Sequence, residues 1–563
     1  MGYDDVTVAI GEFGRYQKRI YFLLSIPAMS AALHSMAGVF LSAQPSFRCL
    51  LPEENLENAT FELPSNLTGY PPDIWSNGTK ELSSCESYVV RSKVQNNSDA
   101  DTEFQAQSIF VEKCNSFVYD KSIFTLTTTS EFNLVCDRAW LRAMADSIFM
   151  VGMMIGSIIF GDLADRYGRK QIICYCVTAQ AAGGLLAALA PELYSFMIFR
   201  AIIGSTENGL ILVAFVAAIE LVIPERRLMT GTGLQLFFTL GYASVALLAY
   251  FIRNWRFLQV VFVIPSVGML AYWWVMPESV RWMLSNGRVE EAKAVLLKAS
   301  SENGVELSRE TLDGMLNENS STSKKAESET TSIYHLFKYP TLRRKTLLLC
   351  AIWFIITSEY YGLSWDTSST GGNIYVKFVL AALVELPGHA LPYFTLDKWG
   401  RKIVLSGCMC LSGFVLLSTQ FVPNDMTWLT ILLTMMGKFA ITAAFDVIFI
   451  FTAEQYPTVI RNTGVGACAT WGRIGGIVAP SILYSSVVWR SLPLVIFGTG
   501  SVIASVLTLF LPETLNQKLP DTIEEGERRG RSLRAEHHVI NLTKSDEAMR
   551  LQSDEKTKLQ SIS

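Results

Sequence analysis

Long runs of apolar residues separated by short polar loops dominate this sequence. Arg19–Ser42 and Val495–Leu511 are two such runs, and a helix needs about 20 mostly apolar residues to cross a bilayer. Twelve segments of this kind recur, centred near residues 31, 154, 181, 207, 240, 266, 355, 382, 411, 440, 475 and 500. Those near 355, 382 and 475 also carry charges. The pattern predicts an all-α membrane protein with twelve transmembrane helices.

Composition excludes several classes of protein. Only 17% of the residues are charged, against about 25% in soluble domains. The net charge is −4, and the sequence has no basic domain, so nucleic acid is not an expected partner. The sequence contains no phosphate-binding loop motif, no metal-ligand spacing and no catalytic constellation. We therefore expect a lipid-embedded protein that is not an enzyme and binds no cofactor or metal.

Basic residues in the short loops predict the orientation, because Lys and Arg favour the cytoplasmic side. The loops after spans 3, 7 and 9 carry none. The loops after spans 2, 4, 8 and 10 carry Arg166, Arg169, Lys170, Arg226, Arg227, Lys398, Arg401, Lys402 and Arg461. Arg253 and Arg256 in loop 5–6 are a minor exception. Both termini are expected in the cytoplasm, with the protein in the plasma membrane.

This orientation places the segment 44–141 outside the cell. Four glycosylation sequons lie in it, at Asn58, Asn66, Asn77 and Asn96. The same segment holds Cys49, Cys85, Cys114 and Cys136, which in an oxidising compartment predict two disulfides with three pairings open. We expect an extracellular glycosylated loop.

The sequence also predicts the division of the chain. We expect a cytoplasmic N-terminus over 1–19, a first six-helix half over 20–276 and a second half over 346–511. Between the halves, 277–345 is polar and begins with an amphipathic helical pattern, so it is expected to be a cytoplasmic loop with helices. The charged segment 512–563 is expected to be a disordered cytoplasmic tail.

A long-range repeat relates the two halves. "DRYGRK" at Asp165 returns as "DKWGRK" at Asp397, an offset of 232. Glu220 and Arg227 return as Glu454 and Arg461 at an offset of 234, and "PES" at 277 returns as "PET" at 512. Three matches in the same order predict a parallel repeat of two six-helix halves. In transporters built this way the substrate site lies between the halves near the midplane.

The motifs also resemble a known family. "GDLADRYGRK" with its echo, "PESVRW" and "PET" resemble the major facilitator superfamily. The cysteine-bearing loop, "FNLVCDRAW", "WRFLQ" and "LVELPG" resemble the organic cation transporters, solute carrier family 22. The opening "MGYDDV" and "YYGLSW" look most like the insect members. The resemblance implies a major facilitator fold and alternating-access transport of small organic ions.

Several motif residues are candidates for conformational control. Gly161 is expected to let helices approach closely. Asp165 is expected to pair with Arg169 or with a neighbouring helix N-terminus. The remaining candidates, which form further cytoplasmic ion pairs in this interpretation, are Glu220, Arg227, Asp397, Arg401, Glu454 and Arg461. The resemblance implies that such contacts hold the outward-open state; the alternative is that they only set topology.

Charges inside the spans are the best candidates for the substrate site, because they are costly there. An organic cation needs a carboxylate for its charge and aromatic faces for its body. The candidates are Trp353, Tyr360, Tyr361, Glu385, Lys438, Phe445, Asp446 and Arg473. The resemblance implies that Trp353, Tyr360 and Glu385 line the central site; packing roles are the alternative. His389 follows Glu385 by four residues and shares its helix face, as a pH-sensitive pair or a local hydrogen bond.

Arg473 departs from the pattern of the mammalian cation carriers, for which the resemblance implies an aspartate at this position. The resemblance implies an arginine there in the anion and carnitine-type branches, and also in the insect members that this sequence resembles. We expect a polyspecific carrier of small organic cations; a carnitine-like zwitterion or organic anion carrier is the alternative. A sugar-porter relative and a non-transporting receptor on this fold are less favoured. The oligomeric state is left open.

Overall fold

The computed structural model describes residues 3–50, 54, 59–62, 73–76, 79–82, 84–94, 105–223, 226–305, 311–312, 334–366, 372–423, 425–517, 520, 522–525 and 527. The asparagines of the four sequons and most of the expected C-terminal tail lie outside these residues. The chain divides into two compact units. The N-terminal unit holds residues 3–309 and 373–382, and the C-terminal unit holds 310–372 and 383–563. The domain boundaries expected from the sequence stay a prediction.

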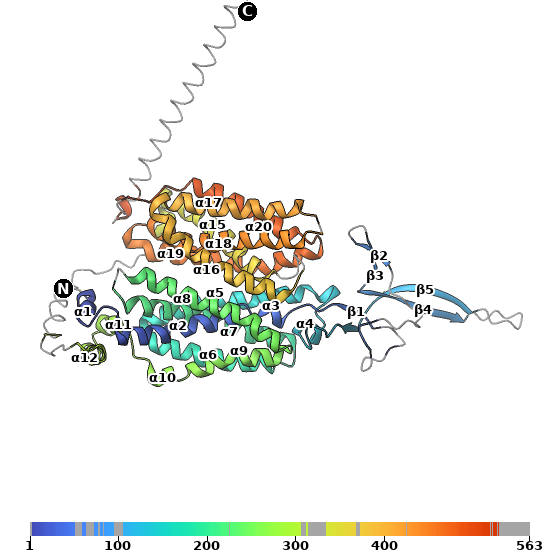
Figure 1. The fold of residues 1–563 in the computed structure, drawn as a ribbon, viewed down its shortest axis with the longest axis horizontal. Helices are drawn as coiled ribbons and strands as arrows, with labels where there is room; N and C mark the ends of the chain where they lie inside the picture. The colour runs from blue at the N-terminus through green and yellow to red at the C-terminus, as the bar shows by residue number, and fades with distance from the viewer. Residues whose placement is uncertain are drawn as a thin grey trace, which may run out of the picture. The chain divides into compact units, whose positions relative to one another are not determined.

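Helices make up most of both units (Figure 1). In the N-terminal unit they are α1 (Tyr3–Ala9), α2 (Arg15–Ser35), α3 (Gly38–Leu41), α4 (Thr128–Glu131), α5 (Trp140–Tyr167), α6 (Arg169–Ala188), α7 (Leu193–Glu220), α8 (Arg227–Phe251), α9 (Trp255–Met269), α10 (Tyr272–Val275), α11 (Val280–Ser285) and α12 (Val289–Asn303). In the C-terminal part of the sequence they are α14 (Tyr334–Lys338), α15 (Pro340–Trp365), α16 (Ile374–Trp399), α17 (Arg401–Ser418), α18 (Thr427–Gln455), α19 (Arg461–Tyr484) and α20 (Leu492–Leu509).

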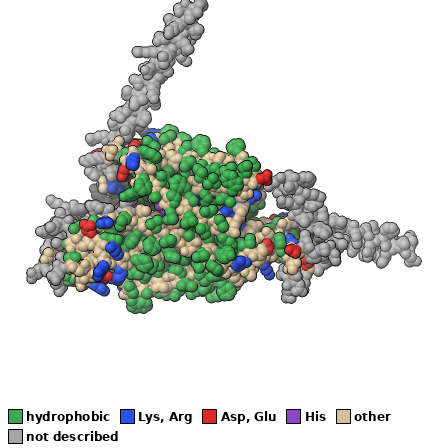
Figure 2. Space-filling model, in the orientation of Figure 1, with side chains coloured by type: hydrophobic (Ala, Val, Ile, Leu, Met, Phe, Trp, Pro, Cys, Tyr) green, Lys and Arg blue, Asp and Glu red, His purple; other side chains and the backbone are tan. Residues whose placement is uncertain are grey.

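The twelve expected span centres all lie within these helices, which confirms the predicted fold class. Eleven helices in the described part of the chain are long and apolar enough to cross a membrane. The twelfth, α19, has 24 residues, but Arg461, Arg473 and several glycines lower its mean hydropathy. Figure 2 shows hydrophobic side chains covering the helices on the face in view, as lipid contact requires.

The same pattern of helix packing occurs within each half of the sequence. In the first half, α2 packs on α8, α6 packs on α9 and α6 packs on α7. In the second half, α15 packs on α19, α17 packs on α20 and α17 packs on α18. These pairs match in order, so the repeat seen in the motifs is also a repeat of three-dimensional packing.

Glycines allow α5 and α7 to approach closely, but Gly161 is not one of them. A Cβ on Gly152 would lie 2.1 Å from the Ala201 carbonyl oxygen, and one on Gly156 would lie 2.0 Å from that of Ser205. A Cβ on Gly161 would make only an ordinary 3.6 Å contact with Leu212. The role expected for Gly161 therefore belongs to glycines one to three turns earlier on α5.

The first turns of α16 belong to the N-terminal unit and carry an aromatic cluster. The Tyr375 ring stacks on Phe40 with 5.5 Å between centroids. The Phe378 ring packs edge-on against Phe40 at 5.0 Å and against Tyr242 at 4.7 Å. Aromatic contacts of this kind account for the assignment of residues 373–382 to this unit.

The loop between the first two spans contains three antiparallel strand pairs. They are β1 (Phe47–Cys49) with β6 (Phe117–Tyr119), β2 (Asp73–Ser76) with β3 (Thr79–Leu82), and β4 (Glu86–Val94) with β5 (Gln105–Lys113).

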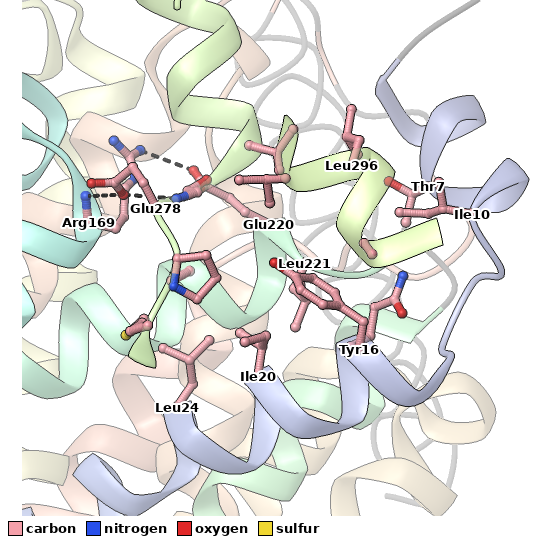
Figure 3. Close-up of a pocket in the computed structure, with 18 residues that line it drawn as sticks. Thr7, Ile10, Tyr16, Ile20, Leu24, Arg169, Glu220, Leu221, Glu278 and Leu296 are labelled. Carbon is pink, nitrogen blue, oxygen red and sulfur yellow. Dashed lines mark hydrogen bonds and ion pairs between the residues drawn. The ribbon is translucent and has the colours of Figure 1, made fainter. Parts of the chain in front are cut away.

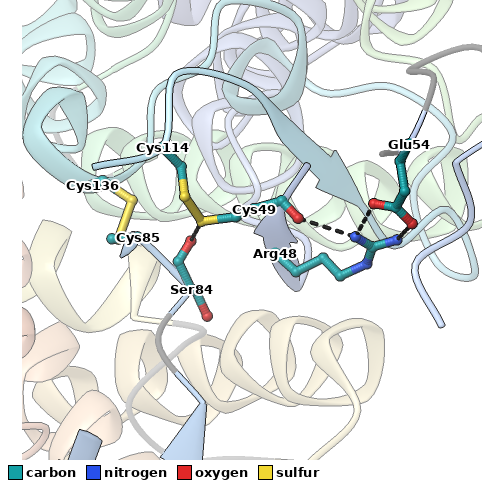
Figure 4. Close-up of a disulfide and its surroundings, with 7 residues drawn as sticks. All are labelled: Arg48, Cys49, Glu54, Ser84, Cys85, Cys114 and Cys136. Carbon is teal, nitrogen blue, oxygen red and sulfur yellow. Dashed lines mark hydrogen bonds and ion pairs between the residues drawn. A yellow bond between two sulfur atoms is a disulfide. The ribbon is translucent and has the colours of Figure 1, made fainter. Parts of the chain in front are cut away.

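Two disulfides join the four cysteines of this loop (Figure 4). They connect Cys49 to Cys114 and Cys85 to Cys136, one of the three pairings left open by the sequence. Next to Cys49, the buried Arg48 guanidinium forms a two-pronged ion pair with Glu54, at 2.6 and 2.7 Å. The loop is thus cross-linked close to its first strand.

Candidate functional site

Arg169, the second arginine of "DRYGRK", holds a cluster of charges together in the N-terminal unit (Figure 3). Arg169 Nη2 lies 2.9 Å from Asp165 and 3.0 Å from Glu220. Its Nη1 donates to the Ala164 carbonyl at 3.1 Å. Because Asp165 ends α5, Arg169 starts α6 and Glu220 ends α7, one guanidinium joins three helix ends. We call these residues, with Glu278 and Ser279, the Arg169 cluster.

Glu278 caps the N-terminus of α6. One of its carboxylate oxygens accepts from the backbone N–H groups of Arg169 at 2.8 Å and Lys170 at 3.1 Å. A carboxylate is favoured there because the first amides of a helix lack internal partners and carry a partial positive charge. Gly168 precedes the helix at φ +107°, and a Cβ on it would lie 2.3 Å from the Glu278 carboxylate. Glycine is therefore required at this position.

The second half builds the same cluster from the repeated motifs. Arg401 lies 3.3 Å from Asp397 and 3.2 Å from Glu454. Glu513 accepts from the backbone N–H groups of Arg401 and Lys402, at 3.0 and 3.1 Å. We call these residues, with Thr514, the Arg401 cluster.

The agreement between the clusters extends to single hydroxyl groups. Ser279 donates to Glu220 at 2.6 Å, and Thr514 donates to Glu454 at 2.5 Å. The sequence predicted the Asp165–Arg169 pair, and the structure forms it together with its counterpart, Asp397–Arg401. It gave Glu278 and Glu513 no role, although the repeated "PES" and "PET" were a signal for them. The expected pairs of Glu220 with Arg227 and of Glu454 with Arg461 stay predictions.

The start of α2 contacts α12 beside the Arg169 cluster. Asn303 accepts from the Tyr16 backbone N–H at 2.9 Å and donates to the Ile10 carbonyl at 2.7 Å. Arg19 donates twice to Glu302, each time at 2.8 Å, and this hydrogen bonding holds the pKa of the Glu302 carboxyl below its usual range.

A cavity of about 40 Å³ lies next to these contacts, lined by Leu24 and Leu221 among others (Figure 3). Ligand pockets for organic molecules usually measure about 300–1,000 Å³. This cavity is therefore too small for the substrate of a transporter.

A buried ion pair lies in the C-terminal unit. Lys438 Nζ lies 2.9 Å from the Glu385 carboxylate, and both side chains are at most 1% exposed. Tyr360 donates its hydroxyl to Glu385 at 2.8 Å. Lys438 donates to Ser364 at 2.6 Å and lies 3.6 Å from the Tyr360 ring centroid. The two charges thus have several partners, as buried charges in a membrane require.

A second pair lies close by on the same two helices, α16 and α18. His389 Nδ1 lies 2.6 Å from Asp446 Oδ2. The Asp446 side chain is 22% exposed, whereas that of Glu385 is 0% exposed. Asp446 is therefore the more accessible acid of the two. The sequence placed His389 beside Glu385 on one helix face, but the structure pairs it across helices with Asp446.

Aromatic rings surround Asp446 and the buried pair. Phe445 and Tyr360 stack with 5.0 Å between centroids, and Trp353 packs edge-on against Phe449 at 4.5 Å. Tyr361 packs edge-on against Tyr360 at 5.4 Å. The structure thus brings together seven of the eight predicted site residues, and adds His389 and Phe449.

Glu359 makes its hydrogen bonds to two other helices of the C-terminal unit. This fully buried carboxylate accepts hydrogen bonds from Ser412 of α17 and Ser501 of α20. Glu359 therefore links three packed helices, and we assign it a role in packing.

Arg473, the eighth predicted residue, lies half-buried on α19. Gly475 nearby allows α19 to approach α15, since a Cβ there would lie 2.1 Å from the Phe354 carbonyl oxygen. The salt bridges described above pair Glu385 with Lys438 and Asp446 with His389. These two pairs join α16 to α18, whereas Arg473 belongs to α19.

The N-terminal unit also buries a charge. Arg200 is 1% exposed, donates to the His34 carbonyl at 3.1 Å and lies 4.1 Å from the Phe149 ring centroid. The Asp146 carboxylate lies 3.8 Å from the Arg200 guanidinium.

Arg256, one of the two exceptions to the charge rule, pairs with Glu131 at 2.5 Å. Its position therefore has a structural explanation.

Comparisons with known proteins agree with this architecture. Residues 87–524 match the family described as "Sugar (and other) transporter". The chain is 44% identical over 540 residues to the "Organic cation transporter protein" of Drosophila melanogaster, covering 94% of this chain and 95% of that protein. It is 34% identical to the human "Organic cation/carnitine transporter 2", covering 93% of each.

Solved structures give the fold. The inward-open xylose transporter XylE of E. coli superposes with a TM-score of 0.54 at 17% identity, covering 69% of this chain and 89% of that chain. The family match covers most of the chain, and the relatives align over nearly their full length. This protein therefore belongs to the sugar (and other) transporter family and, within it, to the multi-pass membrane transporters of solute carrier family 22.

Proposed function

We propose that this protein carries small organic cations across the plasma membrane by alternating access, with Asp446 as the carboxylate that faces the cation. Its relatives named above include an organic cation transporter. The proposal for the site rests on one observation, the difference in exposure between Asp446 and Glu385.

Asp446 has the surroundings that an organic cation needs. The cation's charge requires a carboxylate that it can reach, and its apolar body requires aromatic faces. Asp446 is partly exposed, and Phe445 and the 41% exposed Phe449 flank it on α18. Glu385 is already neutralised by Lys438 in a fully buried pair. We assign Glu385 and Lys438 to holding Tyr360 and the helices in place around the substrate.

The Arg169 and Arg401 clusters supply matching elements for alternating access. Each joins three helix ends through one guanidinium and one helix-capping glutamate. Charge clusters of this kind can break and re-form between two arrangements of packed helices. We propose that Asp165, Arg169 and Glu220, with Asp397, Arg401 and Glu454, stabilise one of the two access states.

The proposed orientation follows the charges in the loops. Both termini and the two clusters face the cytoplasm, and the disulfide-bonded segment 44–141 faces outward. Disulfides form in oxidising compartments, which supports this assignment. The partners are then the lipid bilayer and a small organic ion.

Arg473 favours a second candidate function, transport of a carnitine-like zwitterion or an organic anion. A permanent cation on a span could bind a carboxylate. One relative's name includes carnitine. We rank this candidate second, because the partly exposed Asp446 and its aromatic neighbours fit a cation.

Uptake by cells expressing the protein tests the proposal. Labelled tetraethylammonium, carnitine and p-aminohippurate are compared at equal concentration, with surface abundance measured in parallel. We expect saturable tetraethylammonium uptake well above that of control cells. Uptake restricted to carnitine or p-aminohippurate would support the second candidate instead.

A further inference from the structure

Two cysteines that the transport proposal does not use lie in contact. Cys350 on α15 and Cys468 on α19 have their sulfur atoms 3.9 Å apart. Cys468 is fully buried, and Cys350 is half-buried. The Tyr456 hydroxyl lies 3.4 Å from the Cys468 sulfur and donates to Thr346 at 2.9 Å. The two thiols are therefore close to van der Waals contact, one on a buried residue and one on a half-buried residue.

Helix packing fixes the distance between these thiols. A Cβ on Gly475 would clash with the Phe354 carbonyl of α15, and a Cβ on Gly472 would lie 3.1 Å from the Trp353 ring. The two helices are thus packed closely one to two turns beyond the cysteines. The other four free cysteines lie in other helices, Cys174 and Cys176 on α6 and Cys408 and Cys410 on α17.

The spacing suits one soft electrophilic centre bound by both sulfurs. Two sulfurs bound at about 2.3 Å to one centre lie about 3.8 Å apart at the tetrahedral angle and about 3.5 Å apart at the angles near 100° of a pyramidal, three-coordinate centre. The 3.9 Å between the two thiols is within about half an ångström of both. Sulfur ligands prefer soft centres. Trivalent arsenic is such a centre, and it forms one bond to an isolated thiol but two to a matched pair.

We propose that Cys350 and Cys468 form a dithiol site for trivalent organic arsenicals. With phenylarsine oxide, two As–S bonds form, the As–O bonding is lost, and the two thiol protons leave with the oxygen as water. Arsenic remains trivalent, so no oxidant is needed. The bridge joins α15 to α19 near Trp353 and Arg473, and therefore inhibits uptake; this consequence rests on the proposed function.

Labelling with biotinylated phenylarsine oxide tests the site without any transport measurement. Membranes holding the full-length chain are labelled, washed with a monothiol and then eluted with 2,3-dimercaptopropanol. We expect label that resists the monothiol and is released by the dithiol. In Cys350→Ser and in Cys468→Ser the resistant label falls at least about tenfold. Each variant loses the second As–S bond, which forms within one protein molecule and therefore resists competition by a monothiol.

Cys410→Ser is the matched control, since Cys410 is also half-buried but lies on α17. It should keep the resistant label. If buried Cys468→Ser fails to fold, the half-buried Cys350→Ser alone carries the test. Resistant label that survives in Cys350→Ser would overturn the proposal. So would its loss in Cys410→Ser. Uptake by labelled cells is measured separately, so a failure of the transport proposal leaves the labelling result readable.

Discussion

Asp446 and Glu385 are two acids with different surroundings. Glu385 has a lysine at 2.9 Å, a tyrosine hydroxyl at 2.8 Å and no exposed surface. Asp446 has a histidine at 2.6 Å and keeps 22% of its side chain exposed. Burial with a fixed cation removes an acid from competition for a substrate, whereas partial exposure keeps it available. This difference separates a structural acid from a candidate substrate contact.

Replacing only one member of the Glu385–Lys438 pair should destabilise the protein more than replacing both. Glu385→Gln leaves Lys438 as a buried charge without its partner, which costs about 3–5 kcal/mol. The double variant Glu385→Gln with Lys438→Met removes that charge and should recover most of the loss. Thermal unfolding of the purified protein in detergent measures both. Equal unfolding temperatures for the single and double variants would show that the pair does not hold the site together.

Single residues of the site could be chosen from the sequence, but their partners could not. A charge inside an apolar run is costly and therefore conspicuous, which drew attention to Glu385, Lys438 and Asp446. Pairing depends on how each helix is rotated about its axis, which no local pattern specifies. The i, i+4 spacing suggested Glu385 with His389, whereas the packing of α16 on α18 brings His389 to Asp446.

At the scale of elements, the two clusters show what the repeated motifs do. In each cluster the arginine that begins a helix pairs with the aspartate four residues earlier and with a glutamate at the end of the following helix. A second glutamate, from a distant segment, caps the helix that this arginine begins. The capping contacts span 109 and 112 residues, so local spacing gave no sign of them. The repeat of "PES" as "PET" was the only sequence signal.

Removing one cap charge should alter the rate of transport more than substrate affinity. Glu278→Gln keeps the size of the side chain but loses its charge at the start of α6, a loss of about 1 kcal/mol. If the Arg169 cluster stabilises one access state, maximal uptake changes about fivefold, with KM nearly constant. Glu291→Gln is the control, because Glu291 is an exposed acid of the nearby α12. A change in KM alone would argue against this role.

At the scale of the whole molecule, the twelve helices and the repeat could be predicted because apolar length and spaced motifs are local signals. The assignment of residues 373–382 to the N-terminal unit could not, since it depends on Tyr375 and Phe378 packing against distant rings. The disulfide pairing also depends on folding of the whole loop. Long-range contacts, and not local propensity, decide these features.

The central claim is that Asp446 is the carboxylate that faces the transported cation. The most direct test is the concentration dependence of tetraethylammonium uptake in Asp446→Asn and Asp446→Glu, normalised to surface abundance. Asn keeps the size and can still hydrogen bond to His389, so it removes chiefly the charge.

We predict that KM rises at least about tenfold in Asp446→Asn, because the attraction between two opposite charges about 5 Å apart is roughly 3 kcal/mol at an effective dielectric constant of about 20. Asp446→Glu should retain more of the affinity, and Arg473→Ala should alter uptake without abolishing it. A wild-type KM in Asp446→Asn would contradict the account, because the cation would then be bound without this carboxylate.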